Sequence, residues 1–568
     1  MGERNIHMKF NKTIEKKIDK LFQPYTRSVS PGCAVGITRH GEFLYKKGYG
    51  YANLEHNSPI TADTVFDVGS MAKQFTGLAI ALLEQAGQLS IQKRIRTYLP
   101  DFPAYAGAVK VADLLYHTSG IRNYTVLAYY MLGCHENDTL TSEEVYNLLR
   151  SLPSLSFSPG ERWEYNDSNY FLLGRIVERV SGLSLGAFTR EKIFDPLDMH
   201  HTLFREHAAL VIPNRALSYV RYPIAFRSPS QYRQSGALSD QYYAYVSGYE
   251  HTGAEGLFTT VEDLARWDRN FRDNRLGQAG PALIDRMLTT GQLRDGQPLN
   301  YGYGINMTTW KGKRCVGHDG ATQAFTSTMF HFPEEDATLI CLSNQSDVTA
   351  GAYKNQIMDL VFPDCAPTQP ALAPSKRKVP EREIHKLAGA YLNPETSSIW
   401  EIRPRERTLV IKVNRSAEVV LSRLHPLEYR PANPQVNLAL RILLDPPGKV
   451  DRLEGAQDGV PFTFFPFHRK PLMPKKLAKY AGEYTCEGLN TTFMVSAQAD
   501  SLVFKNHNRH FCSMDLSYNF AIQDFFVSFD PHPVISVIQF LRKKEKVHAF
   551  VYRDYDGDRR EDFMFLRQ

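Results

Sequence analysis

The chain has 568 residues, too many for a single hydrophobic core, which rarely grows past about 250–300 residues. Its 43% hydrophobic and 23% charged residues are those of an average globular protein, which excludes disorder, collagen and coiled coil for the chain as a whole. The net charge of +6 is small for this length and no basic tract is present, so nucleic acid is not an expected partner.

The N-terminal residues, MGERNIHMKF, contain no apolar stretch typical of a signal peptide. No apolar run in the chain reaches the ~18 residues that a membrane helix needs. We therefore expect a cytoplasmic protein with no membrane partner. The seven cysteines are scattered and never spaced Cys-x-x-Cys, which predicts reduced thiols and no metal site.

The first part of the chain mixes strand and helix patterns. Strand-like runs occupy residues 33–38 and 43–49. Residues 75–83 are apolar almost all round, which predicts a buried helix that Gly87 ends. Strand patterns return at 323–343. Strands at both ends with helices between them predict an α+β domain whose first and last strands share a sheet.

Two proline-rich segments divide the chain. Residues 362–382 hold five prolines, which predicts an extended linker, and 466–476 hold three more. We expect domains at 1–365, 383–466 and 475–568.

The two C-terminal domains have related openings. Each begins with Lys-Leu-Ala, at 386–388 and 476–478, and then reaches Gly-x-Tyr, at 389–391 and 482–484. Alternating apolar residues follow in both, which predicts small antiparallel β-barrels. Near the end, the aspartates of residues 554–558 resemble the start of a calcium loop, but the glutamate that such a loop has at position twelve is missing. Asp556-Gly557 therefore predicts a hairpin turn.

The first candidate for chemistry is Ser70-Met71-Ala72-Lys73, at the start of the buried helix. Residues three apart share a helix face, so the Ser70 hydroxyl and the Lys73 amine can meet. A helix N-terminus favours an oxyanion, and burial alone lowers the pKa of a lysine. Taken alone, Ser-x-x-Lys is more often an N-cap serine with a surface lysine.

Two further motifs are weak by themselves. Tyr165-Asn166-Asp167 precedes a helical pattern at 170–181, and a tyrosine close to cations can act as a general base. Its ordinary interpretation is a polar N-cap region. His318 lies in Gly317-His318-Asp319-Gly320, which we expect to form a turn before a strand. The two glycines let backbone approach a ligand closely, although a lone histidine in a turn is more often structural.

One motif is misleading. Residues 182–186, Gly-Leu-Ser-Leu-Gly, match the nucleophile-elbow pattern, which requires a strand, a sharp turn and a helix. Here the segment follows a helical pattern, so Gly182 is predicted to cap a helix and Ser184 is not expected to be a nucleophile.

Together, the three motifs resemble the Ser-x-x-Lys, Tyr-x-Asn and Lys/His-x-Gly elements of the penicillin-recognising serine hydrolases, and especially their class C β-lactamase-related branch. The resemblance covers about residues 25–348 and includes the flanking segments 114–121, 256–265 and 301–304. It implies a serine β-lactamase-like (transpeptidase-like) α+β domain with an antiparallel sheet and a helical cluster. With two lipocalin-like barrels behind it, the architecture resembles that of the D-aminopeptidases.

This resemblance implies a role for each motif. Ser70 would be the nucleophile that forms an acyl-enzyme, Lys73 would assist its deprotonation, and Tyr165 would be the base that relays the proton to the leaving group. Backbone N–H groups of Ser70 and of Ala321, which follows Gly320, would form the oxyanion hole.

The remaining motif residues depart from the family pattern. Asp167 replaces an asparagine, so it would hold Lys73 protonated more strongly and shift the base role toward Tyr165. Asp167 would also help bind the α-ammonium group of a D-residue. His318 stands where many relatives have lysine, and a histidine is only partly charged near neutral pH. This weakens carboxylate recognition and disfavours β-lactamase and carboxypeptidase activity.

The function we expect is therefore a D-aminopeptidase-like serine hydrolase that cleaves amides or short peptides with an N-terminal D-residue. It needs no metal or organic cofactor and could form a homodimer. The alternatives are a carboxylesterase on the same scaffold and a non-catalytic penicillin-binding-like protein.

Overall fold

The computed structural model describes most of the chain. The described residues are 12–26, 29–128, 138–221, 241–322, 324–345, 350–362, 386–393, 399–405, 408–413, 418–425, 427–431, 438–446, 449–457, 460–467, 477–486, 491–498, 501–506, 515–518, 520–522, 525–528, 535–543, 546–556 and 559–568. Two compact units result, one of Met1–Thr125, His135–Ile224 and Ala237–Ala366, the other of Val126–Cys134, Ala225–Gly236 and Pro367–Gln568. The predicted linkers lie largely outside the described residues, and the three domain boundaries stay a prediction.

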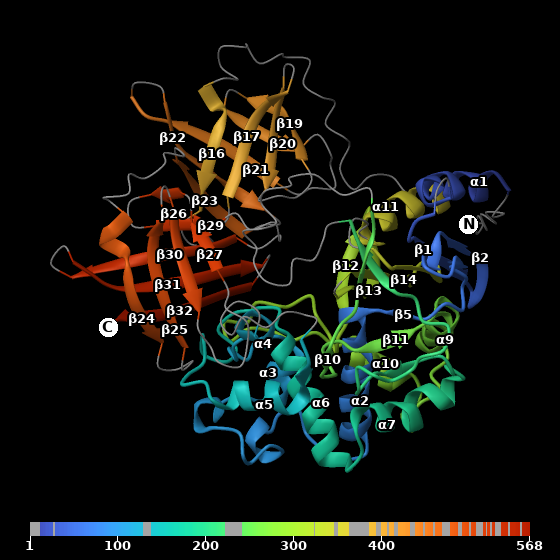
Figure 1. Ribbon diagram of the computed structural model, residues 1–568. Coiled ribbons are helices and arrows are strands. Elements are labelled where there is room, and N and C mark those ends of the chain that lie inside the picture. The colour runs from blue at the N-terminus through green and yellow to red at the C-terminus, as the bar shows by residue number, and fades with distance from the viewer. Residues whose placement is uncertain are drawn as a thin grey trace. The chain divides into compact units, whose positions relative to one another are not determined.

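A six-stranded antiparallel sheet forms the centre of the first unit (Figure 1). Its order is β12 (Asn306–Trp310), β13 (Lys313–Thr322), β14 (Phe325–Phe332), β15 (Ala337–Ser343), β1 (Cys33–Arg39) and β2 (Glu42–Tyr49). β1 pairs with β15, with Val35 opposite Cys341. The prediction that early and late strands share one sheet is therefore confirmed.

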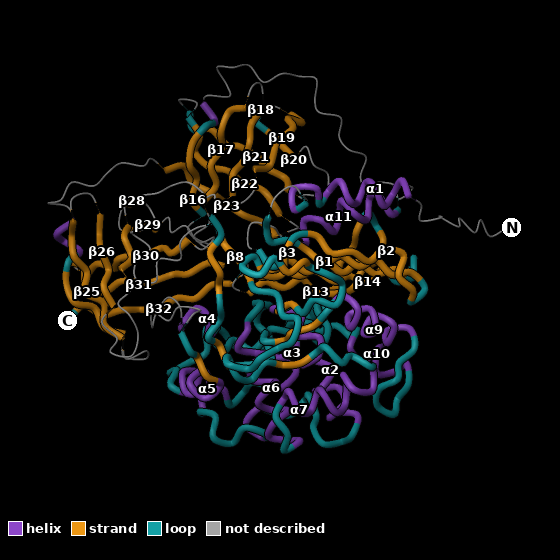
Figure 2. The backbone as a smooth tube through the Cα atoms, turned by 45° about the vertical axis from the view of Figure 1, so that its right-hand side comes forward, coloured by secondary structure: helices purple, strands orange, loops and turns teal. Residues whose placement is uncertain are grey.

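Helices cover both faces of this sheet (Figure 2). On one face α1 (Lys12–Leu21) and α11 (Ala350–Val361) pack in a hydrophobic cluster that includes Phe22 and Tyr49. On the other face lies the helical cluster with α9 (Val261–Arg272). Its other helices are α2 (Ala72–Gln85), α3 (Val111–Leu115), α4 (Tyr124–Val126), α5 (Ser142–Arg150), α6 (Asp167–Ser181), α7 (Leu185–Thr189) and α10 (Pro281–Met287). Among the described residues, no helix has the length and apolar character needed to cross a bilayer.

The predicted buried helix is α2. Almost every residue of α2 is buried, and Gly87, in the left-handed region at φ +69°, follows its end. α2 packs against α6, and the first turns of the two helices lie next to each other.

Short strands complete the first unit. A three-stranded sheet joins β5 (Phe66–Asp67), β11 (Leu257–Thr259) and β7 (Leu203–Phe204). The pairs β3 (Tyr51–Asn53) with β4 (Ser58–Pro59), β6 (Leu140–Thr141) with β10 (Tyr249–Glu250), and β8 (Ser218–Val220) with β9 (Tyr243–Tyr245) are peripheral. The Val68 N–H donates to the Leu257 carbonyl oxygen at 3.0 Å, which ties the first residue of β11 to the turn that leads into α2.

The second unit is made of antiparallel β-structure. Its first part is a closed barrel of β16 (Gly389–Leu392), β17 (Ile399–Arg405), β18 (Thr408–Val413), β19 (Glu418–His425), β20 (Glu428–Pro431), β21 (Leu438–Leu444), β22 (Val450–Gln457) and β23 (Val460–Phe467). Its second part is a nine-stranded sheet of β24 (Gly482–Cys486), β25 (Thr491–Gln498), β26 (Ser501–Asn506), β27 (Asp515–Tyr518), β28 (Phe520–Ile522), β29 (Phe525–Ser528), β30 (Ile535–Lys543), β31 (Lys546–Asp556) and β32 (Arg559–Arg567).

The relation between the two C-terminal parts is visible in one repeated contact. The Tyr391 hydroxyl donates to the Leu387 carbonyl oxygen at 2.8 Å, and the Tyr484 hydroxyl donates to the Tyr480 carbonyl oxygen at 2.9 Å. Both tyrosines are buried and both bonds span four residues. β31 and β32 pair as an antiparallel hairpin, with Asp556 opposite Arg559; Gly557 of the expected turn lies outside the described residues.

The nucleophile-elbow pattern has a structural explanation. Gly182, at φ +74°, caps the end of α6, as predicted. Ser184 is the N-cap of α7: its Oγ accepts from the Ala187 N–H at 3.2 Å and donates to Glu206 at 2.9 Å.

We expect Ser184→Ala to lower the free energy of unfolding by about 1 kcal/mol, because an N-cap hydroxyl is lost, and to leave the chemistry of the protein unchanged. Urea unfolding and hydrolytic activity measure the two effects. Loss of activity in a folded Ser184→Ala protein would contradict the capping role.

Candidate active site

The three motifs meet at the start of α2. Ser70 lies in a 3-10 turn, Gly69–Met71, that leads directly into this helix. The Lys73 Nζ, one turn further on, donates a hydrogen bond to the Ser70 Oγ at 2.9 Å. The structure therefore brings the hydroxyl and the amine together, as their spacing predicts.

Lys73 is fully buried, and its amine has three acceptors. Besides Ser70, Nζ donates to the Asp167 Oδ1 at 2.7 Å and to the Ala254 carbonyl oxygen at 3.0 Å. An ammonium group has three donors and no acceptor. The surroundings of Lys73 therefore match the charged form of the side chain.

The pKa of Lys73 follows from two opposing effects. Burial lowers this pKa, but the negative charge of Asp167, helped by Tyr165, outweighs burial and raises it above the usual value. The expectation from burial alone thus has the wrong sign. The second expectation, that Asp167 keeps Lys73 protonated, agrees with this direction.

Tyr165 and Asp167 are positioned by the start of α6. Asn166 is the N-cap, and its Oδ1 accepts from the Ser168 N–H at 2.8 Å. Asp167 therefore lies in the first helical turn, where a negative charge is favoured. The Lys73 Nζ lies 4.8 Å from the centroid of the Tyr165 ring.

His318 lies inside strand β13 and not in a turn before a strand, so that expectation is corrected. The flanking glycines are explained by close backbone contacts: a Cβ at Gly317 would lie 2.0 Å from the Met329 carbonyl oxygen of β14. Strand pairing therefore overrides the turn preference of this glycine-rich segment.

Both ring nitrogens of His318 are occupied. The Tyr301 hydroxyl donates to Nε2 at 2.9 Å, and Nδ1–H donates to the Asp319 carbonyl oxygen. Burial, and then the Lys73 cation, lower the pKa of His318 to about 4. His318 is therefore a neutral group at neutral pH.

Glycines also let β13 approach the turn that carries Ser70. A Cβ on Gly320 would lie 2.0 Å from the Val68 carbonyl oxygen. A Cβ on Gly69, where φ is +51°, would lie 2.8 Å from the Ala321 carbonyl oxygen. The backbones of Ser70 and Ala321 are consequently neighbours, as an oxyanion hole made of their N–H groups requires.

Sequence reasoning assigned no role to two residues that support the site. His117 Nδ1 accepts from the Asn166 N–H at 3.2 Å, and its ring centroid lies 4.6 Å from that of Tyr165. Tyr301 orients His318. Both lie in segments that the resemblance included, but a buried aromatic residue in a loop gives no signal of its partner. The Ala254 carbonyl was missed because backbone acceptors carry no sequence signature.

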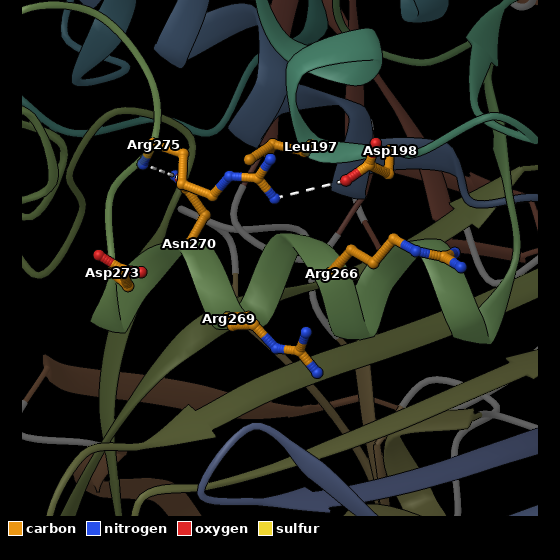
Figure 3. A pocket seen from close by; sticks show the side chains of 7 residues that line it. All are labelled: Leu197, Asp198, Arg266, Arg269, Asn270, Asp273 and Arg275. Carbon is orange, nitrogen blue, oxygen red and sulfur yellow. Dashed lines mark hydrogen bonds and ion pairs between the residues drawn. The ribbon is translucent and has the colours of Figure 1, made fainter.

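Other features of the first unit are separate from this site. Among the described residues, no group of three or more His, Cys, Asp or Glu side chains could hold a metal ion. A surface pocket is lined by Arg266, Arg269 and Asn270 of α9 together with Leu197, Asp198, Asp273 and Arg275 (Figure 3). It shares no residue with the site, and Arg266 and Arg275 are ion-paired with Asp263 and Asp198.

Comparison with known proteins gives a consistent picture. The Beta-lactamase family model matches residues 18–361. The chain is 28% identical over 413 residues to a penicillin-binding protein of Bacillus subtilis, covering 70% of this chain and 87% of that protein. It is 26% identical over 392 residues to a D-aminopeptidase of Brucella ovis, covering 69% of this chain and 68% of that protein. The solved structure of a D-amino acid amidase from Ochrobactrum anthropi SV3 shares the fold, with a TM-score of 0.51 and 20% identity over 62% of this chain and 100% of that one.

Because His318 is buried in its neutral form, we expect the fold to lose stability in acid. Its pKa falls from 6.5 in the unfolded chain to about 4 in the folded one, so the unfolded chain binds more protons between these values. The stabilisation from neutral His318 is present above pH 6.5 and is lost as the pH falls to about 4, by roughly 3 kcal/mol.

We expect His318→Asn to flatten this part of the stability profile, measured by urea unfolding from pH 7 to pH 4. His56→Asn, at an exposed histidine, is the matched control. Equal slopes for His318→Asn and the unmodified protein would contradict a buried, neutral His318.

Proposed function

This chain belongs to the beta-lactamase family and is a serine hydrolase, and we propose that it cleaves amides and short peptides with an N-terminal D-amino acid. The reaction would proceed through an acyl-enzyme on Ser70. The D-aminopeptidase of Brucella ovis, similar over 69% of this chain, supports this substrate class.

The observation that carries the proposal is the neutral state of His318. Lysine at this position would be a fixed cation suited to the carboxylate of a penicillin or of a peptide C-terminus. His318 has both nitrogens engaged and a pKa lowered to about 4 by burial and by Lys73. Asp167 neutralises the buried Lys73. These charges favour a substrate with a free amine over one with a free carboxylate.

The proposed mechanism gives each residue one task. The Ser70 Oγ forms a bond to the substrate carbonyl carbon while Tyr165, acting as its phenolate, takes the serine proton, since protonated Lys73 can donate but cannot accept. The N–H groups of Ser70 and Ala321 stabilise the oxyanion. Tyr165 then passes its proton to the leaving nitrogen as the C–N bond breaks. Water hydrolyses the resulting ester and restores the Ser70 hydroxyl.

The remaining residues shape this site. Asp167 keeps Lys73 charged and balances its charge. Gly320 leaves room for β13 to reach the turn of Ser70, so that Ala321 can complete the oxyanion hole.

The test compares hydrolysis of D-alanine p-nitroanilide, L-alanine p-nitroanilide and p-nitrophenyl acetate. We expect D-selective amide cleavage, and we expect Ser70→Ala to lower kcat by at least about a thousandfold, because the nucleophile is removed. Ser184→Ala is the control serine.

Each outcome has a distinct meaning. Turnover of the ester alone, lost in Ser70→Ala, would favour a carboxylesterase. Acylation of Ser70 by a β-lactam with no turnover of any substrate would favour a non-catalytic binding protein. Activity that survives Ser70→Ala would exclude the proposed nucleophile.

A further inference from the structure

We propose that Asp67 is a positioning residue for the nucleophile, and that its carboxylate holds the turn that carries Ser70 in the reactive conformation. This inference rests on the assignment of Ser70 as the nucleophile and not on the class of substrate. Asp67 lies at the end of β5 and belongs to none of the three motifs.

Asp67 is buried and accepts a hydrogen bond from the turn itself. The residue is only 4% exposed, and its Oδ1 accepts from the Gly69 N–H at 3.0 Å. Gly69, with φ at +51°, directly precedes Ser70. A glycine has wide conformational freedom, so hydrogen bonds must fix the peptide units beside it. The Asp67 carboxylate supplies such a bond one residue before the nucleophile.

The other contacts that hold this turn come from groups whose charge does not change. The Val68 N–H donates to the Leu257 carbonyl oxygen at 3.0 Å, and the Val68 carbonyl oxygen accepts from the Ser327 Oγ at 2.8 Å. β5 pairs with β11, where Asp67 lies opposite Phe258. None of these partners titrates near neutral pH, whereas a carboxyl group can.

The surroundings of Asp67 make it titrate close to neutral pH. Burial raises the pKa of Asp67 to about 6, although the Gly69 N–H and the positive charges of Arg205, which follows β7, and of Arg215 act in the opposite direction. β11, the partner strand, contributes no ionisable side chain. Keeping this carboxylate ionised at pH 7 costs stability, because the folded chain binds the proton more tightly than the unfolded one. Groups of this kind cluster at functional sites.

The charge of Asp67 therefore affects the turn of Ser70. A hydrogen bond to a charged acceptor is roughly twice as strong as one to a neutral acceptor. Proton uptake by Asp67 weakens the bond to the Gly69 N–H and leaves the reacting groups themselves unchanged. We expect activity to fall in mild acid for this reason.

The test measures kcat/KM for p-nitrophenyl acetate from pH 8 to pH 5. This ester has no titrating group, and the range stays above the pKa of His318, about 4. We expect kcat/KM of the unmodified protein to fall about 5- to 10-fold, with a midpoint near pH 6. Asp67→Asn keeps an oxygen acceptor but no charge, so it should show the low value at every pH and no step.

Asp113→Asn is the matched control. Asp113 is a half-buried carboxylate whose pKa is raised by burial, and it too accepts from a backbone N–H, that of Lys110 at 2.8 Å. This variant should keep the step near pH 6. The rate at which a fluorophosphonate labels Ser70 gives a second readout that needs no turnover and should show the same step. Circular dichroism at each pH checks that the variants are folded.

A step near pH 6 that persists in folded Asp67→Asn would overturn the inference, and so would full activity of this variant at pH 8 or loss of the step in Asp113→Asn. The proposed function fails in a different way. If Ser70 reacts with the ester but the protein cleaves no D-alanine anilide, the substrate class is wrong and the pH profile still decides the role of Asp67. Reaction that survives Ser70→Ala would exclude the nucleophile and this inference together.

Discussion

The buried pair of Lys73 and Asp167 is the interaction on which the site depends. Removing two charges from water costs several kcal/mol per ion, and only close contact with further hydrogen bonds compensates for it. Here the 2.7 Å contact is supplemented by bonds from the lysine to Ser70 and Ala254. The pair joins the starts of α2 and α6 and one loop, so the nucleophile, the tyrosine and the loop before β11 are fixed relative to one another.

The same pair determines the direction of proton transfer. A lysine with a raised pKa is a hydrogen-bond donor to the Ser70 oxygen and not its base. The proposed mechanism therefore gives the base role to Tyr165, whose ring lies beside the ammonium. Asp167 neutralises Lys73, and burial keeps His318 uncharged. Neither Lys73 nor His318 therefore offers a fixed cation to a substrate carboxylate. The proposed preference for an amine follows from this balance of charges.

Much of this arrangement could be predicted from residue patterns. The Ser70–Lys73 contact follows from a spacing of three on a helix, and Gly182 follows from its place after a helical pattern. The shared sheet of early and late strands follows from strand patterns at both ends of the domain with helical patterns between them. These features depend on local geometry or on periodicity, and both follow directly from the order of the residues.

Other features depend on contacts between distant segments and could not be predicted in this way. Residue patterns alone gave the wrong sign for the Lys73 pKa shift, because that sign depends on contact with Asp167, 94 residues further on, which only the family resemblance placed beside Lys73. The strand at His318 required knowledge that its glycines face the backbones of β14 and of the turn at Val68.

The most direct test of this account is the charge of Lys73. In protein carrying lysine labelled with ¹⁵N at Nζ, NMR can follow each amine, and Lys73→Arg identifies the signal of Lys73 by its disappearance. The account predicts an ammonium at pH 7 that loses its proton only above the usual range for lysine, and at a lower pH in Asp167→Asn. A neutral Lys73 amine at pH 7 in the unmodified protein would contradict it.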